Sequence, residues 1–339
     1  MNLKLVNMQI QIIKPGILST IQDLGRNLFL LQAVPFSGAM DIFSARIANK
    51  ALDNDDGVAV IEFTYADALF RAESDILIAY AGDGATLIVN DQKLPSERPL
   101  FIPAKSVIEL KNNPKGSRTY LAIAGGWDVP EILGSRSTFL TANIGGKDGR
   151  ILKTGDTLNN IEPSANNTTR LLAALKGDNI NYPKWSIARS LLLPNDRKSI
   201  RIMLAQEFSW FDDLSIVNFF STPYTIGINS NRMGYHLEGL AIDRIQKDEL
   251  LSTAVTPGTI QVTGNGSMVL LMADCQTTGG YPRIGQVAAV DLPLCAQLKP
   301  GDKINFTGIS RHEAEMLYLE REQQLQQLTT AVQYKFLHY

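Results

Sequence analysis

Short apolar runs dominate the chain, and their spacing predicts strands rather than helices. Runs rich in Val, Ile, Leu, Phe and Thr alternate with clusters of Gly, Pro, Asn and Asp, as in strands joined by tight turns. Such spacing favours small barrels, because closing a sheet removes its exposed edges. The predicted strands include 76–81, 86–89, 107–111, 120–124, 199–205, 258–263 and 303–307.

Two segments show a helical pattern instead. Phe43 to Leu52 is one candidate, with Asp41 or Ser44 as a possible cap. A capping box at Ser310 opens the second, and apolar residues then recur at near-helical spacing among Glu, Gln and Arg. We expect one amphipathic helix from about Arg311 to Tyr334, docked on its own barrel.

The two halves of the chain resemble each other in order. Ile10 to Ile13 matches Ile200 to Met203, and Ile61 to Thr64 matches Ile260 to Thr263. The other pairs are Ile21 to Leu24 with Phe211 to Leu214, Met40 with Met233, the strands ending at Asp83 and Asp274, and Pro103 with Pro300. The separation within each pair is nearly constant, which favours a duplication over chance similarity of apolar strands.

The predicted fold class is therefore mainly β, with two tandem β-barrels from an internal duplication and a C-terminal amphipathic helix. The first barrel with its extension is expected at 8–165, and the second at 198–309. The segment 166–197, which is poor in pattern and contains two prolines, is expected to link them. The C-terminal helix is expected at 310–335.

Composition narrows the class of protein. The 339 residues suffice for two cores, and 45% apolar with 19% charged residues is typical of a globular protein. A formal charge of -2 gives no reason to expect nucleic acid or an anionic membrane as a partner. Met1 to Gln11 lacks a signal-peptide pattern, and no apolar run approaches the roughly 20 residues that span a bilayer. With only Cys275 and Cys295, we expect a cytoplasmic protein in which Cys275 is a core thiol rather than a nucleophile.

The most informative stretch is D-C-Q-T-T-G-G-Y-P-R-I, from Asp274 to Ile284. It follows the apolar strand Met268 to Ala273, so several polar groups are expected on one rigid rim. The alternative is a solvated turn whose glycines only supply unusual backbone angles. The candidate residues of this run are Asp274, Gln276, Thr277, Thr278, Gly279, Gly280, Tyr281 and Arg283.

A second polar cluster runs from Asn229 to Gly239. In it Arg232 offers a planar fork of donors for a carboxylate or phosphate, and Glu238 either holds Arg232 or acts on substrate. Asn231 is a further candidate, whereas a lone histidine such as His236 is more often structural.

The first half has its own candidates, Asp23 and Arg26, which flank Gly25 and could orient a substrate or each other. A charged turn that closes a hairpin explains them equally well. The glycine clusters at 134–138 and 145–150 fit no G-x-x-x-x-G-K-[ST] nucleotide loop. Zinc or calcium motifs of familiar type are absent from the sequence, so no metal ligands are predicted.

In the polar clusters described above, the chain resembles the biotin-dependent carboxyltransferase family, also called the allophanate hydrolase subunit 2 family. The resemblance covers roughly Ile12 to Phe306. It is carried by P-G-I-L-S-T-I-Q-D-L-G-R, S-G-A-M-D, G-S-R-S-T, D-G-R-I-L-K-T-G-D, N-R-M-G-Y, P-G-T-I-Q-V and the run from Asp274. It implies that the two barrels are cyclophilin-like. Members include the third subunit of bacterial 5-oxoprolinase and the antagonist partner of a sporulation-kinase inhibitor.

The sequence departs from the family pattern near the expected site. Leu28 and Ala33 stand where glycines are usual, His236 stands where an arginine is usual, and Tyr65 to Asp67 replaces a glycine-rich turn. The D-C-Q-T-T-G-G-Y run is unaltered, which favours a retained activity.

The resemblance implies one of three roles. The leading hypothesis is ATP-dependent hydrolysis of 5-oxoproline to glutamate, in a complex with a smaller B-type subunit and an A-type subunit. One alternative is carboxyl transfer to urea or a related amide, with a separate biotin carrier, because this chain has no Met-Lys-Met biotinylation motif. The other is a non-enzymatic antagonist of a kinase inhibitor.

For the hydrolase, the expected co-substrate is ATP with its Mg²⁺. Arg232 and Arg283 would stabilise developing negative charge, and Asp274 or Glu238 would steer or deprotonate the attacking water. The hydrogen-bonding residues of the segment from Asp274 to Ile284, called the 274 run below, would orient the substrate ring. The two glycines of this segment would allow the substrate to approach closely.

Overall fold

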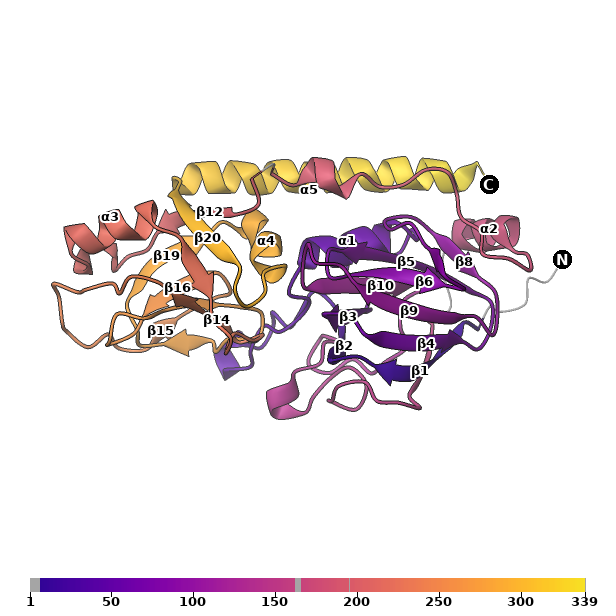
Figure 1. Cartoon of the computed structure of the whole chain (residues 1–339), viewed down its shortest axis with the longest axis horizontal. Helices are drawn as coiled ribbons and strands as arrows, with labels where there is room; N and C mark the ends of the chain where they lie inside the picture. The colour runs from indigo at the N-terminus through magenta and orange to yellow at the C-terminus, as the bar shows by residue number, and fades with distance from the viewer. Residues whose placement is uncertain (1–6, 162–165, 195, 339) are drawn as a thin grey trace. The chain divides into compact units, whose positions relative to one another are not determined.

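The computed structural model describes residues 7–161, 166–194 and 196–338. Outside the described residues lie 1–6 of the N-terminal segment that lacks a signal-peptide pattern, 162–165 of the first predicted domain and 195 of the predicted linker. The fold is mainly β with few helices and a long C-terminal helix, as predicted (Figure 1). No helix within the described ranges is both long and apolar enough to cross a membrane.

The chain divides into two compact units that are not continuous in sequence. The first contains the described residues up to Gly25, Asp41–Leu192 and the chain from Gln324. The second contains Arg26–Met40 and Leu193–Gln323. A short segment from the N-terminal half therefore folds with the C-terminal half, which the duplication did not suggest.

The first unit consists of two sheets rather than one closed ladder. One sheet has the order β11 (Thr157–Asn159), β1 (Gln9–Pro15), β4 (Ala68–Ala72), β9 (Val107–Asn112), β6 (Ala85–Val89) and β7 (Gln92–Lys93). The other has the order β2 (Leu18–Gln22), β3 (Val60–Thr64), β10 (Arg118–Ile123), β5 (Ile76–Gly82) and β8 (Leu100–Ile102). Phe63 of β3 stacks on Phe70 of β4, with ring centroids 6.3 Å apart, so the two sheets share a core.

Helix α1 (Ile42–Lys50) packs on β5 and β10 of this unit. It begins after Asp41, whose carboxylate accepts a hydrogen bond from the Ser44 N–H at 2.8 Å, so the predicted cap is confirmed. Helix α2 (Asn166–Leu175) lies in the segment predicted as a linker.

The second unit is a closed barrel of β12 (Ser199–Leu204), β19 (Arg283–Val287), β16 (Thr259–Val262), β17 (Met268–Leu271), β14 (Gly234–Glu238), β13 (Tyr224–Ile226) and β20 (Lys303–Gly308). Strands β12 and β20 pair in parallel to close it. Helix α3 (Asp213–Ser221) packs on the barrel through Phe219, whose ring stacks on Phe306 with centroids 4.8 Å apart. The smaller elements are α4 (Leu292–Ala296), the ribbon of β15 (Thr253–Ala254) and β18 (Thr278–Gly279), and 3-10 turns at 30–32, 140–142, 189–192, 208–210 and 289–291.

Helix α5 (Arg311–Leu337) begins at the predicted capping box. The Ser310 N–H donates to the Glu313 carboxylate at 2.7 Å, and the Glu313 N–H donates to the Ser310 hydroxyl at 3.1 Å. The helix belongs to the second unit through Gln323 and to the first from Gln324. Ala314 packs against Ala288 and Val290 of the second unit. The expectation that the helix docks on its own barrel therefore holds for its first part, through Gln323, and not for the part from Gln324.

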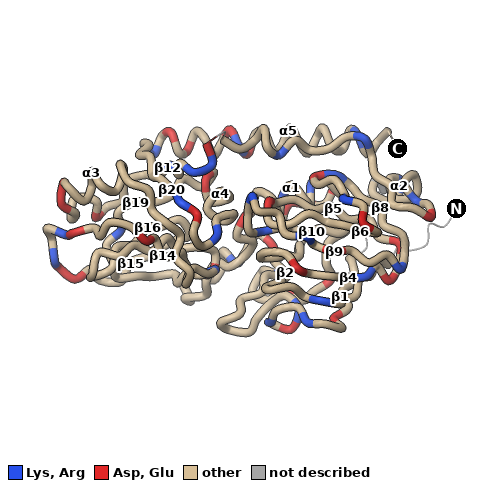
Figure 2. Tube along the Cα trace, in the orientation of Figure 1, with Lys and Arg blue, Asp and Glu red and all other residues tan. Residues whose placement is uncertain are grey.

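Charged residues of both signs are interspersed along the described trace of each unit (Figure 2). This mixture agrees with the formal charge of -2 of the whole chain. Long-range attraction of a highly charged partner needs a field of one sign, and along the described trace the two signs alternate instead.

The matched halves agree in some elements and differ in others. Ile10 and Ile200 lie on the first strand of their units, and Ile61 and Ile260 both lie on strands that are paired on both sides. Ile21, however, lies on β2, whereas its partner Phe211 lies two residues before α3. The difference arises because Asp212 caps α3, accepting hydrogen bonds from the N–H groups of Leu214 and Ser215 at 3.0 and 3.1 Å.

The end of β5 provides a test of the first unit's packing. Gly82 has φ +108, and a Cβ added there would lie 2.4 Å from the backbone oxygen of Arg118 on β10. We expect Gly82→Ala to lower the free energy of unfolding by clearly more than the roughly 1–2 kcal/mol of a left-handed non-glycine residue. Gly155→Ala is the matched control, because Gly155 has φ +89 but nothing within 4 Å of the added atom. Urea unfolding of both variants measures the difference, and equal losses would contradict the close packing.

Candidate functional site

A row of side chains crosses the outer wall of the second barrel. His236 of β14 pairs with Val269 of β17, Val269 pairs with Gln261 of β16, and Gln261 pairs with Arg283 of β19. Directly paired residues point to the same face of a sheet. Their neighbours Tyr235, Leu270 and Ile260 are buried in the barrel core, so the row faces outward.

A pocket of about 270 Å³ lies on this outer wall. It is lined by Asn231, Met233, Gly234, His236, Gln261, Val269, Leu271, Gln276 and Tyr281. Met233, Val269 and Leu271 supply its apolar side chains, and its polar groups are three carboxamides, an imidazole and a phenol. Pockets for drug-sized ligands occupy about 300–1,000 Å³, so this one suits a small polar molecule. Asn231, Gln276 and Tyr281 are residues that the sequence singled out.

The 274 run lies at the edge of the pocket, where its strand β18 pairs with β15 in a short two-stranded ribbon. Thr253 pairs with Gly279 and Ala254 with Thr278, and the Val255 N–H donates to the Thr277 carbonyl at 2.9 Å. Val255 also packs in an apolar cluster with Leu271 and Cys275. The predicted residues Thr277, Thr278 and Gly279 therefore serve the ribbon through their backbone, and Gly280 follows it at an exposed position.

Arg232 and Asp274 form a buried ion pair beside the pocket. The ladder of β14 and β17 continues beyond both strands, because the Asp274 N–H donates to the Arg232 carbonyl at 2.9 Å. The Arg232 guanidinium donates from Nε to Asp274 Oδ2 at 2.7 Å and from Nη2 to Oδ1 at 3.0 Å. Each side chain is 6% exposed, so the pair is bidentate and shielded from water.

The rest of the pair's environment comes from the segment Arg26–Met40. The Ser37 hydroxyl donates to Asp274 Oδ1 at 2.7 Å, and Arg232 Nη2 donates to the Gly38 carbonyl at 2.6 Å. Ser37 is completely buried and has φ +57, a conformation that Ser adopts only when its surroundings enforce it. The sequence prediction did not include these two residues, although the S-G-A-M-D motif that contains them was among the signals.

The ion pair fixes two parts of the pocket wall. Asn231 and Met233, the neighbours of Arg232 in sequence, both line the pocket, and so does Gln276, two residues after Asp274. Both Asp274 oxygens accept hydrogen bonds from Arg232 or Ser37. The structure therefore places Arg232 and Asp274 where they position the wall, behind the residues that line it.

Arg283 forms a second bidentate pair, with a residue that no local pattern had singled out. Its Nε and Nη2 donate to Glu207 Oε2 and Oε1 at 2.7 and 2.6 Å, and its Nη1 donates to the Ala254 carbonyl at 3.3 Å. Glu207 is 4% exposed. Burial raises the pKa of its carboxyl, but the hydrogen bonds from Arg283 outweigh burial and hold that pKa below its ordinary value.

Three other predicted residues lie away from this pocket's lining. Glu238 is exposed on β14. Asp23 belongs to the first unit, where its carboxylate accepts hydrogen bonds from the Ser135 and Ser137 hydroxyls at 2.6 and 2.5 Å and from the Arg136 N–H at 2.6 Å. Arg26 belongs to the second unit, is 1% exposed, and its N–H donates to the Phe36 carbonyl at 2.6 Å.

Cys275 is a core thiol, as expected. It is 3% exposed, and burial, with the nearby Asp274 carboxylate, raises its pKa to about 12. A thiol with so high a pKa is a poor nucleophile at neutral pH. No group of three or more His, Cys, Asp or Glu side chains suited to a metal ion occurs within the described ranges.

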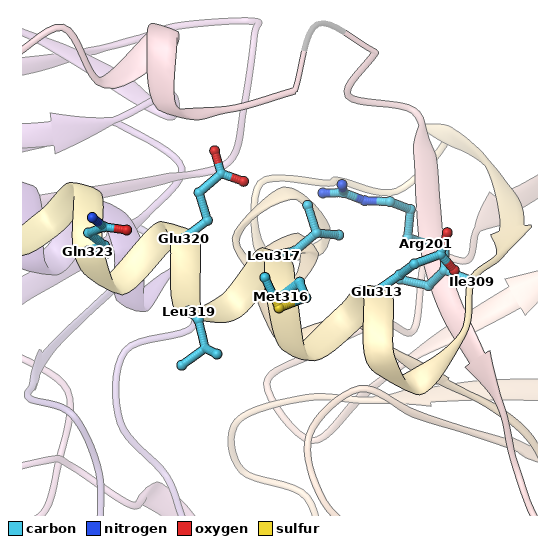
Figure 3. A pocket seen from close by; sticks show the side chains of 8 residues that line it. All are labelled: Arg201, Ile309, Glu313, Met316, Leu317, Leu319, Glu320 and Gln323. Carbon is cyan, nitrogen blue, oxygen red and sulfur yellow. The ribbon is translucent and has the colours of Figure 1, made fainter.

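A larger pocket of about 610 Å³ runs along the first half of α5 (Figure 3). Arg201 and Ile309 line it together with the helical residues Glu313, Met316, Leu317, Leu319, Glu320 and Gln323. Its cationic group, Arg201, already donates to Asp291 at 2.9 and 2.5 Å. The smaller pocket has more convergent polar groups and adjoins the 274 run, so we take it as the candidate site.

Comparison with known proteins decides the family. The model of the carboxyltransferase domain, subdomain A and B, matches residues 32–308. The chain is 35% identical over 319 residues to the C subunit of 5-oxoprolinase from Escherichia coli (strain K12), covering 94% of this chain and 97% of that protein. The chain belongs to the carboxyltransferase domain family.

Other relatives of this carboxyltransferase domain are much longer proteins. Urea amidolyase of Lachancea kluyveri is 31% identical over 322 residues, which are 91% of this chain but 17% of that protein. The crystal structure of the K. lactis urea amidolyase superimposes with a TM-score of 0.83 at 28% identity, covering 94% of this chain and 20% of that one. The predicted relationship to this family is thus confirmed.

The departures from the family pattern have a visible backbone consequence. Ala33, Tyr65 and Asp67, where the sequence predicts departures from glycine, have φ angles of +61, +61 and +77. This left-handed region favours glycine. The backbone at these three residues is therefore of a kind that glycine would adopt without strain. His236, another expected departure, lines the pocket.

The buried pair gives a stability prediction. We expect Asp274→Asn to destabilise the protein by about 3–5 kcal/mol, because it leaves the buried Arg232 charge without its partner. Ser37→Ala removes one neutral donor from the carboxylate and should cost about 1–3 kcal/mol. The double variant should lose less than the sum, because both changes act on the same carboxylate. Chemical denaturation measures all three, and strict additivity would contradict the shared network.

The second pair gives a pH prediction. Glu207 has a lowered pKa in the folded protein, so the unfolded chain takes up its proton first as the pH falls. The stability that the pair contributes should be fully present above about pH 5 and lost as the pH drops through the folded pKa, below the ordinary 4.5. Thermal unfolding between pH 3 and pH 7 of the native chain and Glu207→Gln measures this. An unchanged acid slope in the variant would show that Glu207 does not carry the effect.

Proposed function

We propose that this chain is a subunit of an ATP-dependent 5-oxoprolinase that hydrolyses 5-oxo-L-proline to L-glutamate. The observation that carries the proposal is the 35% identity to a protein named as the C subunit of 5-oxoprolinase, over 97% of its length. The name of that relative implies other subunits, and the proposed partners are a smaller B-type and an A-type subunit. Because the reaction consumes ATP, the proposed compartment is the cytoplasm.

The chemistry of the pocket supports a small amide as the substrate. A lactam presents one N–H donor and one carbonyl acceptor, and a buried amide group is costly unless both are hydrogen-bonded. Asn231, Gln261 and Gln276 each bring a carboxamide that carries both donor and acceptor. Val269 and Leu271 offer apolar contact to the ring carbons.

In the proposed reaction ATP phosphorylates the oxygen of the lactam carbonyl and ADP leaves. Water then attacks the activated carbon, the ring C–N bond breaks to free the amine, and the resulting acyl phosphate is hydrolysed by a second water to glutamate and inorganic phosphate. We propose that the residues lining the pocket hold the lactam, and that Arg232 and Asp274 act as positioning residues. The groups that bind ATP and its Mg²⁺ and activate the water are assigned to the assembled complex, with Glu238 and Arg283 as this chain's candidates.

A second candidate function rests on the urea amidolyase relatives. Their matching region is 31% identical to this chain, and urea is also a small amide. Carboxyl transfer to such an amide would require a separate biotin carrier. The antagonist role would need neither ATP nor an amide substrate.

The test is glutamate release from 5-oxo-L-proline by the chain alone and by the chain assembled with its candidate A-type and B-type subunits. We expect release only from the complete complex and only with ATP, because the substrate carbonyl must be activated before water attacks. Glutamate is measured by a coupled dehydrogenase assay, and ADP release is followed in parallel.

Three outcomes separate the alternatives. Coupled glutamate and ADP release supports the hydrolase. Carboxylation of urea by the chain with a biotinylated carrier, without glutamate release, would replace it by the transferase. A folded complex that is inactive in both assays would favour the antagonist role.

A further inference from the structure

Gln261 is the most enclosed polar side chain of the pocket. It lies on β16 between Val269 and Arg283 and is 2% exposed, although the amides of Asn231 and Gln276 belong to exposed residues. Both of its side-chain hydrogen bonds are long. Gln276 Nε2 donates to Gln261 Oε1 at 3.4 Å, and Gln261 Nε2 donates to the Tyr281 carbonyl at 3.4 Å. Strong bonds of this type measure about 2.9–3.0 Å, so the carboxamide is oriented but weakly satisfied.

The absence of a side chain at Gly279 leaves room for the Gln261 amide. A Cβ added to Gly279 would lie 2.5 Å from Gln261 Nε2 and 3.5 Å from Oε1. Residue 279 lies on the β18 ribbon, whose pairing with β15 holds it against the amide. The φ of Gly279 is not in the left-handed region, so its backbone conformation does not require glycine. Glycine has a steric role there, because any larger side chain would collide with the Gln261 amide in its present position.

We propose that Gln261 is the specificity-determining residue of the pocket and that it recognises the cis edge of the substrate amide. Its Nε2 donates to the substrate carbonyl and its Oε1 accepts the substrate N–H, in exchange for the two long bonds. This inference rests on the proposed function, which supplies the amide substrate, and it names the feature by which that substrate is selected.

The geometry of amides explains this selection. A carboxamide places its acceptor and one N–H side by side, so it pairs with a group that presents N–H and C=O on the same side. A five-membered lactam is held in this cis arrangement by its ring, and urea or a primary amide offers the same edge. A linear secondary amide is trans and presents the two groups on opposite sides. One carboxamide therefore accepts lactams and ureas and rejects peptide-like amides.

The test measures the affinity of the assembled complex, without ATP, for two ring compounds by calorimetry. One is 5-oxo-L-proline, and the other is the ring ketone in which a CH₂ group replaces the N–H. We expect the native complex to prefer the lactam by about tenfold or more, because the ketone leaves Gln261 Oε1 without a donor. In Gln261→Met, which keeps the side-chain length but has no hydrogen-bonding group, this preference should disappear.

Two further variants separate recognition from folding. Gln286→Met is the matched control, because Gln286 lies on the neighbouring β19 but hydrogen-bonds to Thr259 and Pro257 at 2.8 and 2.9 Å and does not line the pocket. It should keep the lactam preference. Gly279→Ala retains the amide but displaces it, so it should lose the preference even if Gln261→Met fails to fold.

The outcomes are distinct from those of the function test. A lactam preference that survives in Gln261→Met or in a folded Gly279→Ala overturns the inference, and glutamate release by the native complex would then leave the proposed function standing. Equal binding of lactam and ketone by the native complex also overturns it. If the native complex binds neither compound and releases no glutamate, the inference and the proposed function fall together.

Discussion

The buried pair of Arg232 and Asp274 is the interaction on which the candidate site depends. Two opposite charges that are shielded from water are stable only when each remaining polar atom has a partner, and here Ser37 and Gly38 supply partners from a distant stretch of sequence. The pair joins the start of β14, the end of β17 and the segment Arg26–Met40. Because pocket residues adjoin both charges in sequence, the geometry of the pocket follows from that of the pair.

Much of the fold follows from local sequence signals. Apolar runs between turn residues predict the strands, and the caps at Asp41 and Ser310 are contacts between residues only three positions apart. The run from Asp274 was also recognisable as a candidate site, because a buried strand that opens into many polar groups is unusual. In the second unit the strands close into a barrel, whereas in the first they form two sheets.

The partners of the charged residues were not predictable in the same way. Glu207 lies far from Arg283 in sequence, and Ser37 lies far from Asp274, so neither pair leaves a local pattern. Gln261 was overlooked because it sits in an apolar strand, where alternation alone shows that it faces outward but not what it meets. Asp23 and Arg26, only three residues apart, belong to different compact units, which no periodicity reveals.

The segment Arg26–Met40 has a consequence for how such a chain can be divided. A polypeptide that starts at the second barrel would lack Ser37 and Gly38, and its Arg232 and Asp274 would lose partners that they cannot replace from nearby sequence. No single break in the gene therefore yields two self-sufficient halves. The second barrel is thus not a module that can be cut out at one point, because the segment that completes its ion pair lies before most of the first unit in the chain.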